Sequence, residues 1–178
     1  MLDIITKKKN KEILTHEELY YAFNGYLNKE IPDYQMTSLL MAIVINGLTF
    51  EETFDLTKIF IDSGETFKFD KKVCDKHSTG GIGDTVTLVA IPILGALNIP
   101  VVKMSGRGLG ITGGTIDKLE SIPGFDVNLT KEDYYNNLDK IGIVVGAQTN
   151  DLVPLDKVIY ALRDVSGTTE SIPLIASS

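Results

Sequence analysis

The chain has 178 residues, which is enough for one domain, or for a small domain plus part of a second one. Its residues are 43% hydrophobic and 23% charged, as in globular proteins, so a disordered or fibrous chain is excluded. The 24 acidic residues outnumber the 17 basic ones. The resulting net charge of −7 argues against binding to nucleic acid or to an anionic membrane surface.

The cysteine and histidine content limits the kinds of site that the chain can build. The single cysteine, Cys74, excludes an internal disulfide, and two histidines, His16 and His77, are too few for a structural zinc cluster. This composition is typical of a protein in the reducing cytoplasm. The longest apolar run, residues 88–102, is shorter than a bilayer requires and contains two prolines, so the sequence predicts no membrane span.

The first third of the chain has the pattern of a helical layer. Thr15–Glu18 and Thr49–Glu52 have the spacing of a capping box, in which the Thr and Glu side chains satisfy backbone N–H groups at a helix start. Another helix is predicted to begin at Pro32–Asp33. Residues 36–45 within it are apolar nearly all round, so it must be buried on several sides or pack against a partner. Gly64 is expected to cap the helix that starts at Thr49.

After Gly64 the pattern changes to alternating strands and helices, which indicates βαβ units with a parallel sheet. Strands are predicted at 73–75, 100–104 and 141–145, and helices at 84–97, 115–121, 130–140 and from about 154 onward. The fold class is therefore α/β. The order is a small all-helical domain, residues 1–64, then the first part of a mainly parallel-sheet α/β domain, residues 65–153, and then a further helical segment from about 154 to 178.

Two glycine-rich loops each join a predicted strand to a predicted helix. The first, Asp75–Asp84, contains three glycines and the hydrogen-bond donors of Lys76, Ser78 and Thr79. The second, Ser105–Thr115, contains five glycines. Backbone N–H groups that converge in such loops, together with the start of the following helix, favour an anion. The sequence therefore predicts a phosphate site at the carboxyl ends of adjacent strands.

Other interpretations of these loops stay open. A glycine loop after a strand is often only a tight turn. Residues 108–113 also fit the dinucleotide pattern G-x-G-x-x-G, but no acidic residue closes a following strand at the expected distance. Neither loop has the pattern G-x-x-x-x-G-K-[ST], so a Walker-type ATPase is not supported.

Single residues in and around the loops also have expected roles. His77 is the best candidate for a general acid, because it lies among donors in a polar loop and imidazole titrates near neutral pH. Arg107 is expected to hold backbone carbonyls of its own loop. Cys74 is expected to be buried at a strand end, His16 to be solvated, and Lys7–Lys9 to form a solvated helix end.

Four segments of the sequence resemble the thymidine and pyrimidine-nucleoside phosphorylase family. They are Lys76-His-Ser-Thr-Gly-Gly-Ile-Gly-Asp84, Ser105-Gly-Arg-Gly-Leu-Gly, Thr112-Gly-Gly-Thr-Ile-Asp-Lys-Leu-Glu-Ser121, and Tyr160-Ala-Leu-Arg-Asp164 with Ser171-Ile-Pro-Leu-Ile-Ala-Ser-Ser178. The resemblance runs from the first residues to the last. The final segment is more similar to the broad pyrimidine-nucleoside branch than to the strict thymidine branch.

The resemblance implies a pentosyltransferase that needs no organic cofactor. Inorganic phosphate attacks C1′ of a pyrimidine nucleoside, and the products are the free base and a pentose 1-phosphate. The family also implies a homodimer, and a helical domain, residues 1–64 completed by about 154–178, that faces a larger α/β domain across a cleft. The helix over residues 36–45 is apolar on more faces than one small domain can cover, which predicts that the dimer forms through the N-terminal helices. The partners are accordingly expected to be a pyrimidine nucleoside, phosphate and a second copy of the chain.

The resemblance also implies roles for individual residues, carried over position by position. The implied phosphate ligands are Lys76, Ser78, Thr87, Ser105 and Thr115. The implied pyrimidine contacts are Tyr160, Arg163 and Ser178. His77 and Arg163 are the implied catalytic groups, because the leaving base gains negative charge that they can stabilise. Family members can also carry a monovalent cation such as potassium, for which Gly83 and Thr85 are the local candidates.

The sequence departs from the family pattern at two places. Ile111 stands where the family has a histidine, and its side chain can neither donate nor accept a hydrogen bond. The family pattern continues past Ser178, with a base-binding lysine and further strands. A natural truncation or an expressed fragment that ends there is expected to be inactive by itself. The alternatives are a phosphoribosyltransferase of the same fold type and a non-catalytic dimerisation fragment.

Overall fold

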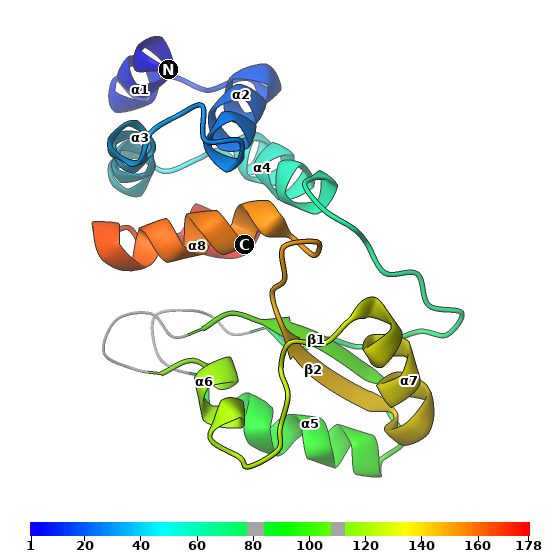
Figure 1. Cartoon of the computed structure of the whole chain (residues 1–178). Helices are drawn as coiled ribbons and strands as arrows, with labels where there is room; N and C mark the ends of the chain where they lie inside the picture. The colour runs from blue at the N-terminus through cyan, green and yellow to red at the C-terminus, as the bar shows by residue number, and fades with distance from the viewer. Residues whose placement is uncertain (78–83, 108–112) are drawn as a thin grey trace. The chain divides into compact units, whose positions relative to one another are not determined.

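The computed structural model describes residues 1–77, 84–107 and 113–178 (Figure 1). The chain divides into two compact units, one formed by residues 1–65 and 150–178 and the other by residues 66–149. The first unit is helical, and the second begins an α/β domain with a parallel sheet, so the predicted fold class is confirmed.

The two units differ in the helices and strands that they contain. The helices of the first unit are α1 (Leu2–Lys9), α2 (His16–Leu27), α3 (Asp33–Asn46), α4 (Phe50–Asp62), α8 (Pro154–Ser166) and α9 (Ile172–Ser177). The second unit contains α5 (Val86–Ala96), β1 (Val101–Ser105), α6 (Thr115–Glu120), α7 (Lys131–Ile141) and β2 (Ile143–Ala147).

Helix starts in both units follow from local sequence. The predicted capping boxes of Thr15 and Thr49 are present at the starts of α2 and α4, and Thr130 forms a third one at the start of α7. In each box the Thr oxygen accepts a backbone N–H three residues later, while the acidic side chain there accepts the Thr backbone N–H. Helix α3 ends at Gly47, whose φ of 72° is a conformation that favours glycine.

The core of the first unit contains residues from both ends of the sequence. Phe23 of α2 and Leu40 of α3 are fully buried, and they belong to the same apolar cluster as Leu155 and Ile159 of α8 and Leu174 of α9. Burial of such side chains contributes about 1.5–3 kcal/mol each to folding. Helices α8 and α9 are therefore part of the helical unit, although they follow the α/β segment in the chain (Figure 1).

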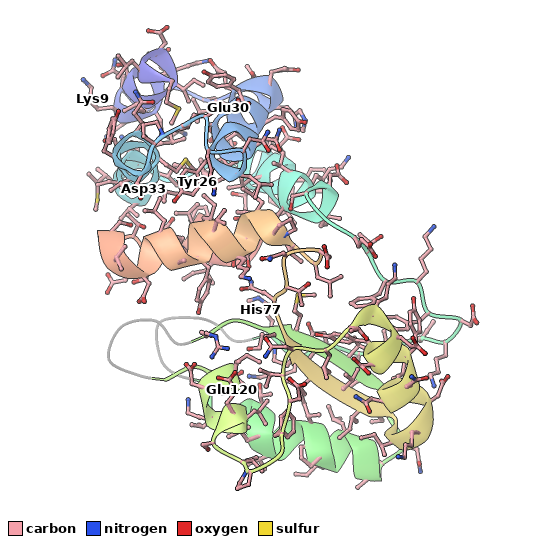
Figure 2. All side chains as sticks on the ribbon, in the orientation of Figure 1. Lys9, Tyr26, Glu30, Asp33, His77 and Glu120 are labelled. Carbon is pink, nitrogen blue, oxygen red and sulfur yellow. The ribbon has the colours of Figure 1, made fainter. Side chains whose placement is uncertain are left out.

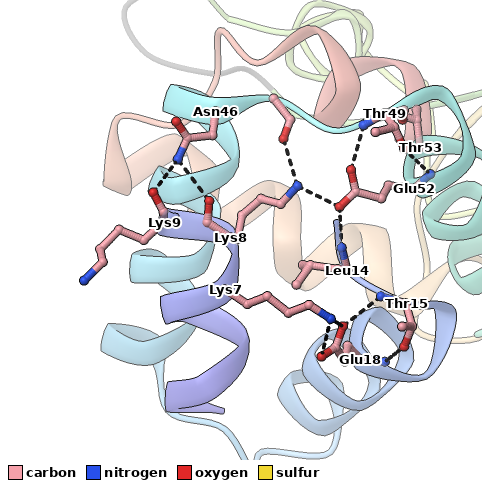
Figure 3. A network of polar contacts seen from close by, with 11 residues as sticks. Lys7, Lys8, Lys9, Leu14, Thr15, Glu18, Asn46, Thr49, Glu52 and Thr53 are labelled. Atoms are coloured by element: carbon pink, nitrogen blue, oxygen red, sulfur yellow. Dashed lines mark hydrogen bonds and ion pairs between the residues drawn. The ribbon is translucent and has the colours of Figure 1, made fainter. Parts of the chain in front are cut away.

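One prediction for α1 is wrong. Lys7–Lys9 do form a helix end, but Lys8 is 3% exposed and is not solvated. Its Nζ lies 2.7 Å from Glu52 Oε1 and donates to the carbonyl of Gly47 at 3.3 Å (Figure 3). A buried ammonium needs such partners, because burying a charge without them costs several kcal/mol.

The sheet of the second unit has two described strands, β1 and β2, which are parallel, with Val101 opposite Ile143 and Ser105 opposite Ala147. The side chains of β2 alternate between two faces. Val145 and Ala147 pack with residues of α6, whereas Gly146 lies against Tyr134 of α7. The glycine is needed there, because a Cβ would overlap with the Tyr134 hydroxyl oxygen.

An aromatic cluster attaches the first residues of the second unit to α7. The ring centroids of Phe67 and Tyr134 are 4.8 Å apart, and those of Phe69 and Tyr135 are 5.2 Å apart. The Tyr135 hydroxyl also donates to the carbonyl of Lys68 at 2.9 Å. Residues 67–69 are therefore fixed on the α/β unit although they form no strand.

The structure corrects two further expectations. Gly64 does not cap α4, which ends with Ser63 as its C-cap. The glycine is required for packing instead, because a Cβ would lie 2.5 Å from Pro154 Cδ and 2.7 Å from the carbonyl oxygen of Asp151. The predicted strand 73–75 is reduced to a single bridge between Cys74 and Val101, and Cys74 is exposed rather than buried.

Among the residues that the structure describes, no helix combines the length and the apolar character that a membrane span requires.

Candidate phosphate and base sites

Three predicted phosphate ligands gather around Asp84, the last residue of the first glycine loop. Lys76 Nζ lies 2.7 Å from Asp84 Oδ1 and 3.3 Å from Thr87 Oγ1. The Thr87 hydroxyl donates to Asp84 Oδ2 at 2.5 Å, and the Thr87 backbone N–H donates to Oδ1 at 3.2 Å. The Thr115 hydroxyl, at the start of α6, donates to the backbone carbonyl of Asp84 at 3.3 Å. Residues from both loops therefore meet beside the start of α5.

The hydrogen bonds within this cluster keep the Asp84 carboxyl ionised. Burial alone raises the pKa of the Asp84 carboxyl, but the hydrogen bonds from Lys76 and Thr87 outweigh burial and lower that pKa to about 2. Asp84 is therefore ionised at neutral pH and faces the Lys76 ammonium. The start of α5 adds partial positive charge from its unpaired backbone N–H groups, which favours a bound anion.

The strand β1 contributes two polar residues to the same unit. Ser105, a predicted phosphate ligand, is the last residue of the strand and pairs with Ala147 of β2. Lys103 is 4% exposed; its Nζ donates to the Lys76 carbonyl at 2.6 Å and lies 3.7 Å from Asp75 Oδ1. Lys103 therefore holds the backbone of Lys76 against β1. The signal for it in the sequence is a lysine inside an otherwise apolar strand.

The remaining residues predicted for this unit are only partly described. His77 is exposed and directly follows Lys76 (Figure 2). Thr85, a candidate cation ligand, is the exposed N-cap of α5. Ser78, Gly83 and Ile111 lie outside the described residues. Within 1–77, 84–107 and 113–178, no group of three or more His, Cys, Asp or Glu side chains is arranged to hold a metal ion.

Arg107 has a structural role through partners that the sequence did not suggest. Its guanidinium pairs with the Glu120 carboxylate through two nitrogens, one of them 2.8 Å from Oε1, and lies 3.4 Å from Asp117 Oδ1. Glu120 is at the end of α6 (Figure 2). Arg107 thus ties the second loop to α6 through carboxylates. Most of the loop whose carbonyls it was expected to hold, residues 108–112, lies outside the described part of the chain.

The predicted pyrimidine contacts lie in the helical unit, on α8 and just after α9. Arg163 is only 2% exposed, and its guanidinium donates to the carbonyls of Thr168, Leu174 and Thr169 at 3.2, 3.1 and 3.0 Å. Burial lowers the pKa of this guanidinium, against the opposing effect of the Asp156 charge. Arg163 therefore fixes the connection between α8 and α9.

Asp156 of α8 interacts with two of the three predicted base contacts: it accepts from Ser178, and its charge acts on Arg163. The Ser178 hydroxyl donates to Asp156 Oδ1 at 2.6 Å, and Asp156 is 4% exposed. Tyr160, one helical turn after Asp156 on α8, is half-buried. A carboxylate only accepts hydrogen bonds, so the single proton of the Ser178 hydroxyl is used in this contact. Two of the predicted contacts, Arg163 and Ser178, thus interact with an aspartate that sequence reasoning did not select.

Besides Lys103, the sequence interpretation missed Asp84 and Asp156 at these sites. Asp84 has a detectable signal, since it stands three residues before Thr87 at the start of a predicted helix, the spacing of a side chain that caps a first turn. Asp156 has none, because its contact with Ser178 depends on how α8 and α9 pack.

The sequence matches both domains of one protein family. Residues 2–64 match the helical bundle domain of the glycosyl transferase family, and residues 70–178 match the a/b domain of that family. The chain belongs to this family. The second match includes residues 150–178, which the structure assigns to the helical unit.

Several relatives are similar over the whole chain. It is 52% identical to a pyrimidine-nucleoside phosphorylase of Geobacillus stearothermophilus and 53% identical to one of Bacillus subtilis, and it spans 42% of the length of each. It is 51% identical to a thymidine phosphorylase of Mycoplasmoides pirum and spans 43% of that protein. In each case the match covers 100% of this chain.

A solved structure shares the fold at low sequence identity. The anthranilate phosphoribosyltransferase of Thermus thermophilus superposes with a TM-score of 0.78 at 19% identity, covering 98% of this chain and 54% of that one. Two units of the kind seen here therefore recur in an enzyme with a distant sequence.

Proposed function

We propose that the protein is a pyrimidine-nucleoside phosphorylase, which transfers the pentose of a pyrimidine nucleoside to inorganic phosphate. The observation that carries this proposal is the cluster of Lys76, Thr87 and Thr115 around the start of α5, in a chain about half identical to enzymes of that name. One ammonium and two hydroxyls beside a helix N-terminus suit a phosphate group.

The proposed reaction makes two demands on the protein. A phosphate oxygen forms a bond to C1′, the bond between C1′ and N1 breaks, and its electron pair goes to the base. The phosphate must be oriented, which we assign to Lys76, Thr87 and Thr115 together with Ser78 and Ser105. Negative charge that develops on the base must be stabilised, which we assign to the Arg163 guanidinium and to His77 as proton donor.

The base itself is the proposed ligand of the helical unit. We assign its contacts to Tyr160, Arg163 and Ser178. The interactions of Arg163 and Ser178 with Asp156 support this assignment, and Tyr160 follows Asp156 by one turn of α8. Thymidine and uridine are both proposed substrates, because similar relatives are named for pyrimidine nucleosides as well as for thymidine.

A homodimer through the N-terminal helices forms part of this proposal. Several large apolar side chains of those helices are exposed: Leu2 by 69%, Tyr34 and Ile45 by 72% each, and Phe50 by 81%. Exposed apolar surface of this kind suits an interface between copies. We further propose a cytoplasmic location, consistent with the single cysteine, and a monovalent cation at Thr85 and Gly83.

A phosphorolysis assay tests the proposed function, with the protein taken at the full length of its relatives. Thymidine or uridine is incubated with and without inorganic phosphate, and release of free base and of pentose 1-phosphate is followed. Phosphate-dependent release of both products in equal amounts is the expected result. A parallel arm offers a free base with 5-phosphoribosyl diphosphate and magnesium. Turnover in that arm alone would replace the proposal with a phosphoribosyltransferase.

A further inference from the structure

We propose that Asp84 is a positioning residue of the phosphate site, which fixes the Lys76 ammonium and the Thr87 side chain so that both act on one anion. This inference rests on the proposed function and extends it to a residue that no resemblance assigned. Its basis is the set of contacts that Asp84 makes with the predicted ligands of both glycine loops.

The first step concerns the Lys76 ammonium. A lysine side chain has a flexible four-carbon stem, so an unrestrained ammonium does not keep one position. Here Nζ is 2.7 Å from Asp84 Oδ1 and 3.3 Å from Thr87 Oγ1. An ammonium has three N–H groups. Within the described residues, two of them are directed to Asp84 and Thr87, and the third is left for a ligand in a defined direction.

The second step concerns Thr87, which is 1% exposed. Its hydroxyl accepts from Lys76 and donates to Asp84 Oδ2, and its backbone N–H donates to Oδ1. The backbone contact holds the first turn of α5 to Asp84. A hydroxyl proton rotates freely about its C–O bond, so it can turn from the carboxylate to an anion that arrives beside Lys76.

The third step links the second loop to the same residue. The Thr115 hydroxyl donates to the backbone carbonyl of Asp84 at 3.3 Å, which fixes the start of α6 to the start of α5. Lys103 holds the backbone of Lys76 in turn, through the bond to its carbonyl at 2.6 Å. Asp84 is therefore the point at which both loops and the charged side chain are connected.

A purely structural role makes a different prediction from a positioning role. If Asp84 only capped the first turn of α5, asparagine would replace it well, because Asn and Asp are equally good caps. Asparagine carries no charge to hold the Lys76 ammonium, however. The variant Asp84→Asn therefore separates the two roles, and Asp84→Ala removes both.

The decisive measurement is the set of Michaelis constants of the protein, taken at the full length of its relatives, in both directions of phosphorolysis. For Asp84→Asn we expect the KM values for phosphate and for pentose 1-phosphate to rise about 10- to 100-fold, the effect of losing a charge-assisted contact. The KM values for nucleoside and free base should change by no more than about two-fold. Asp139→Asn is the matched control, because Asp139 carries the same charge in the same unit, is 79% exposed and pairs with Lys71 at the surface.

Two results would overturn the proposal. An Asp84→Asn variant with wild-type KM for phosphate shows that the residue is only a cap. A lower KM for phosphate shows that Asp84 competes with the ligand instead of positioning its partners. Titration calorimetry with inorganic phosphate measures the same contrast without turnover. The two tests can thus fail separately. If the wild-type protein binds phosphate but releases no base, the proposed function is contradicted, and calorimetry still tests the role of Asp84 in phosphate binding.

A second variant covers the case in which Asp84→Asn does not fold. The double change Lys76→Met with Asp84→Asn removes both charges of the pair together. If Asp84 acts through Lys76, the double variant binds phosphate as weakly as Lys76→Met alone, so the two effects are not additive. A further loss of about ten-fold or more beyond Lys76→Met contradicts the coupling.

Discussion

The Nζ atom of Lys8 lies 2.7 Å from Oε1 of Glu52, and both side chains are almost fully buried although 44 residues separate them. The same Oε1 accepts the backbone N–H of Leu14 at 2.8 Å, and Oε2 accepts that of Thr49 at 2.7 Å (Figure 3). One carboxylate thus joins α1, the segment before α2 and the start of α4. The contact fixes three separate pieces of the helical unit.

Replacing Lys8 by methionine should strongly destabilise this unit. The stem of methionine fills similar space, but the Glu52 carboxylate is left buried without its cation. Removal of one partner of a buried ion pair costs about 3–5 kcal/mol. Urea unfolding followed by circular dichroism measures the change in the free energy of unfolding. The double variant Lys8→Met with Glu52→Gln should recover part of the loss, because no charge is then unpaired.

Lys7 and Glu18 provide the matched control for that prediction. Their ion pair also spans α1 and α2, at 2.8 Å, but its side chains are 29% and 28% exposed. The variant Lys7→Met should cost no more than about 1 kcal/mol, as exposed pairs do. Equal losses for Lys7→Met and Lys8→Met would show that burial of the Lys8 contact does not matter.

The Glu52 carboxylate should also make the stability of the helical unit depend on pH. Burial raises the pKa of Glu52, but the hydrogen bonds from Lys8 and from the Leu14 and Thr49 backbone outweigh it, and the pKa falls below its ordinary value of 4.5. The folded state then binds fewer protons than the unfolded state. The stabilisation is therefore complete above the ordinary pKa and is lost as the pH falls through the lowered one.

Urea unfolding from neutral pH to about pH 3 tests this dependence. The wild type should lose more stability over that range than Glu52→Gln, which has no carboxyl group to protonate. The difference in unfolding free energy between the two should shrink toward low pH. A difference that stays constant with pH would contradict a lowered pKa for Glu52.

Local sequence signals predicted the helix starts but not the long-range contacts. Capping boxes at Thr15 and Thr49 involve residues three positions apart, and the structure has both. Lys8 looked like one of three equivalent lysines, because its burial depends on Glu52 far along the chain. Gly64 looked like a cap for the same reason: the atoms that exclude a side chain there belong to Asp151, Val153 and Pro154.

At the candidate site, too, the sequence predicted individual residues but not the contacts between them. The glycine loop marked Lys76, and the family resemblance marked Lys76, Thr87 and Thr115, which the structure brings together at Asp84. Asp84 itself looked like the end of a loop. The contact between Arg107 and Glu120 spans 13 residues, and no local pattern identifies it.

The Gly64→Ala variant should destabilise the helical unit. An added Cβ would lie 2.5 Å from Pro154 Cδ, 2.7 Å from the Asp151 carbonyl oxygen and 2.8 Å from the Val153 nitrogen. Two of these atoms are backbone and cannot move independently, so we expect a loss of about 1–3 kcal/mol, as for other overpacked sites. Thermal unfolding measures it. Gly113→Ala is the control, because its Cβ would meet Asp117 Cβ at an ordinary 3.7 Å, and a wild-type Tm for both variants would contradict the prediction.

Arg163→Lys should reduce stability even though it keeps the charge. The guanidinium donates to two carbonyls between α8 and α9, those of Thr168 and Thr169, and to the carbonyl of Leu174 in α9. One lysine ammonium cannot reach all three from the same position. Loss of two charge-assisted hydrogen bonds is expected to cost about 3 kcal/mol.

The lower stability should appear in urea unfolding. For the proposed phosphorylase the KM for nucleoside should also rise, because Asp156, whose charge acts on Arg163, accepts the Ser178 hydroxyl. Lys157→Arg, a change of the same kind at an exposed position of α8, should leave both quantities unchanged. If Arg163→Lys raises the KM for nucleoside at wild-type stability, the arginine acts on the base and does not anchor α9.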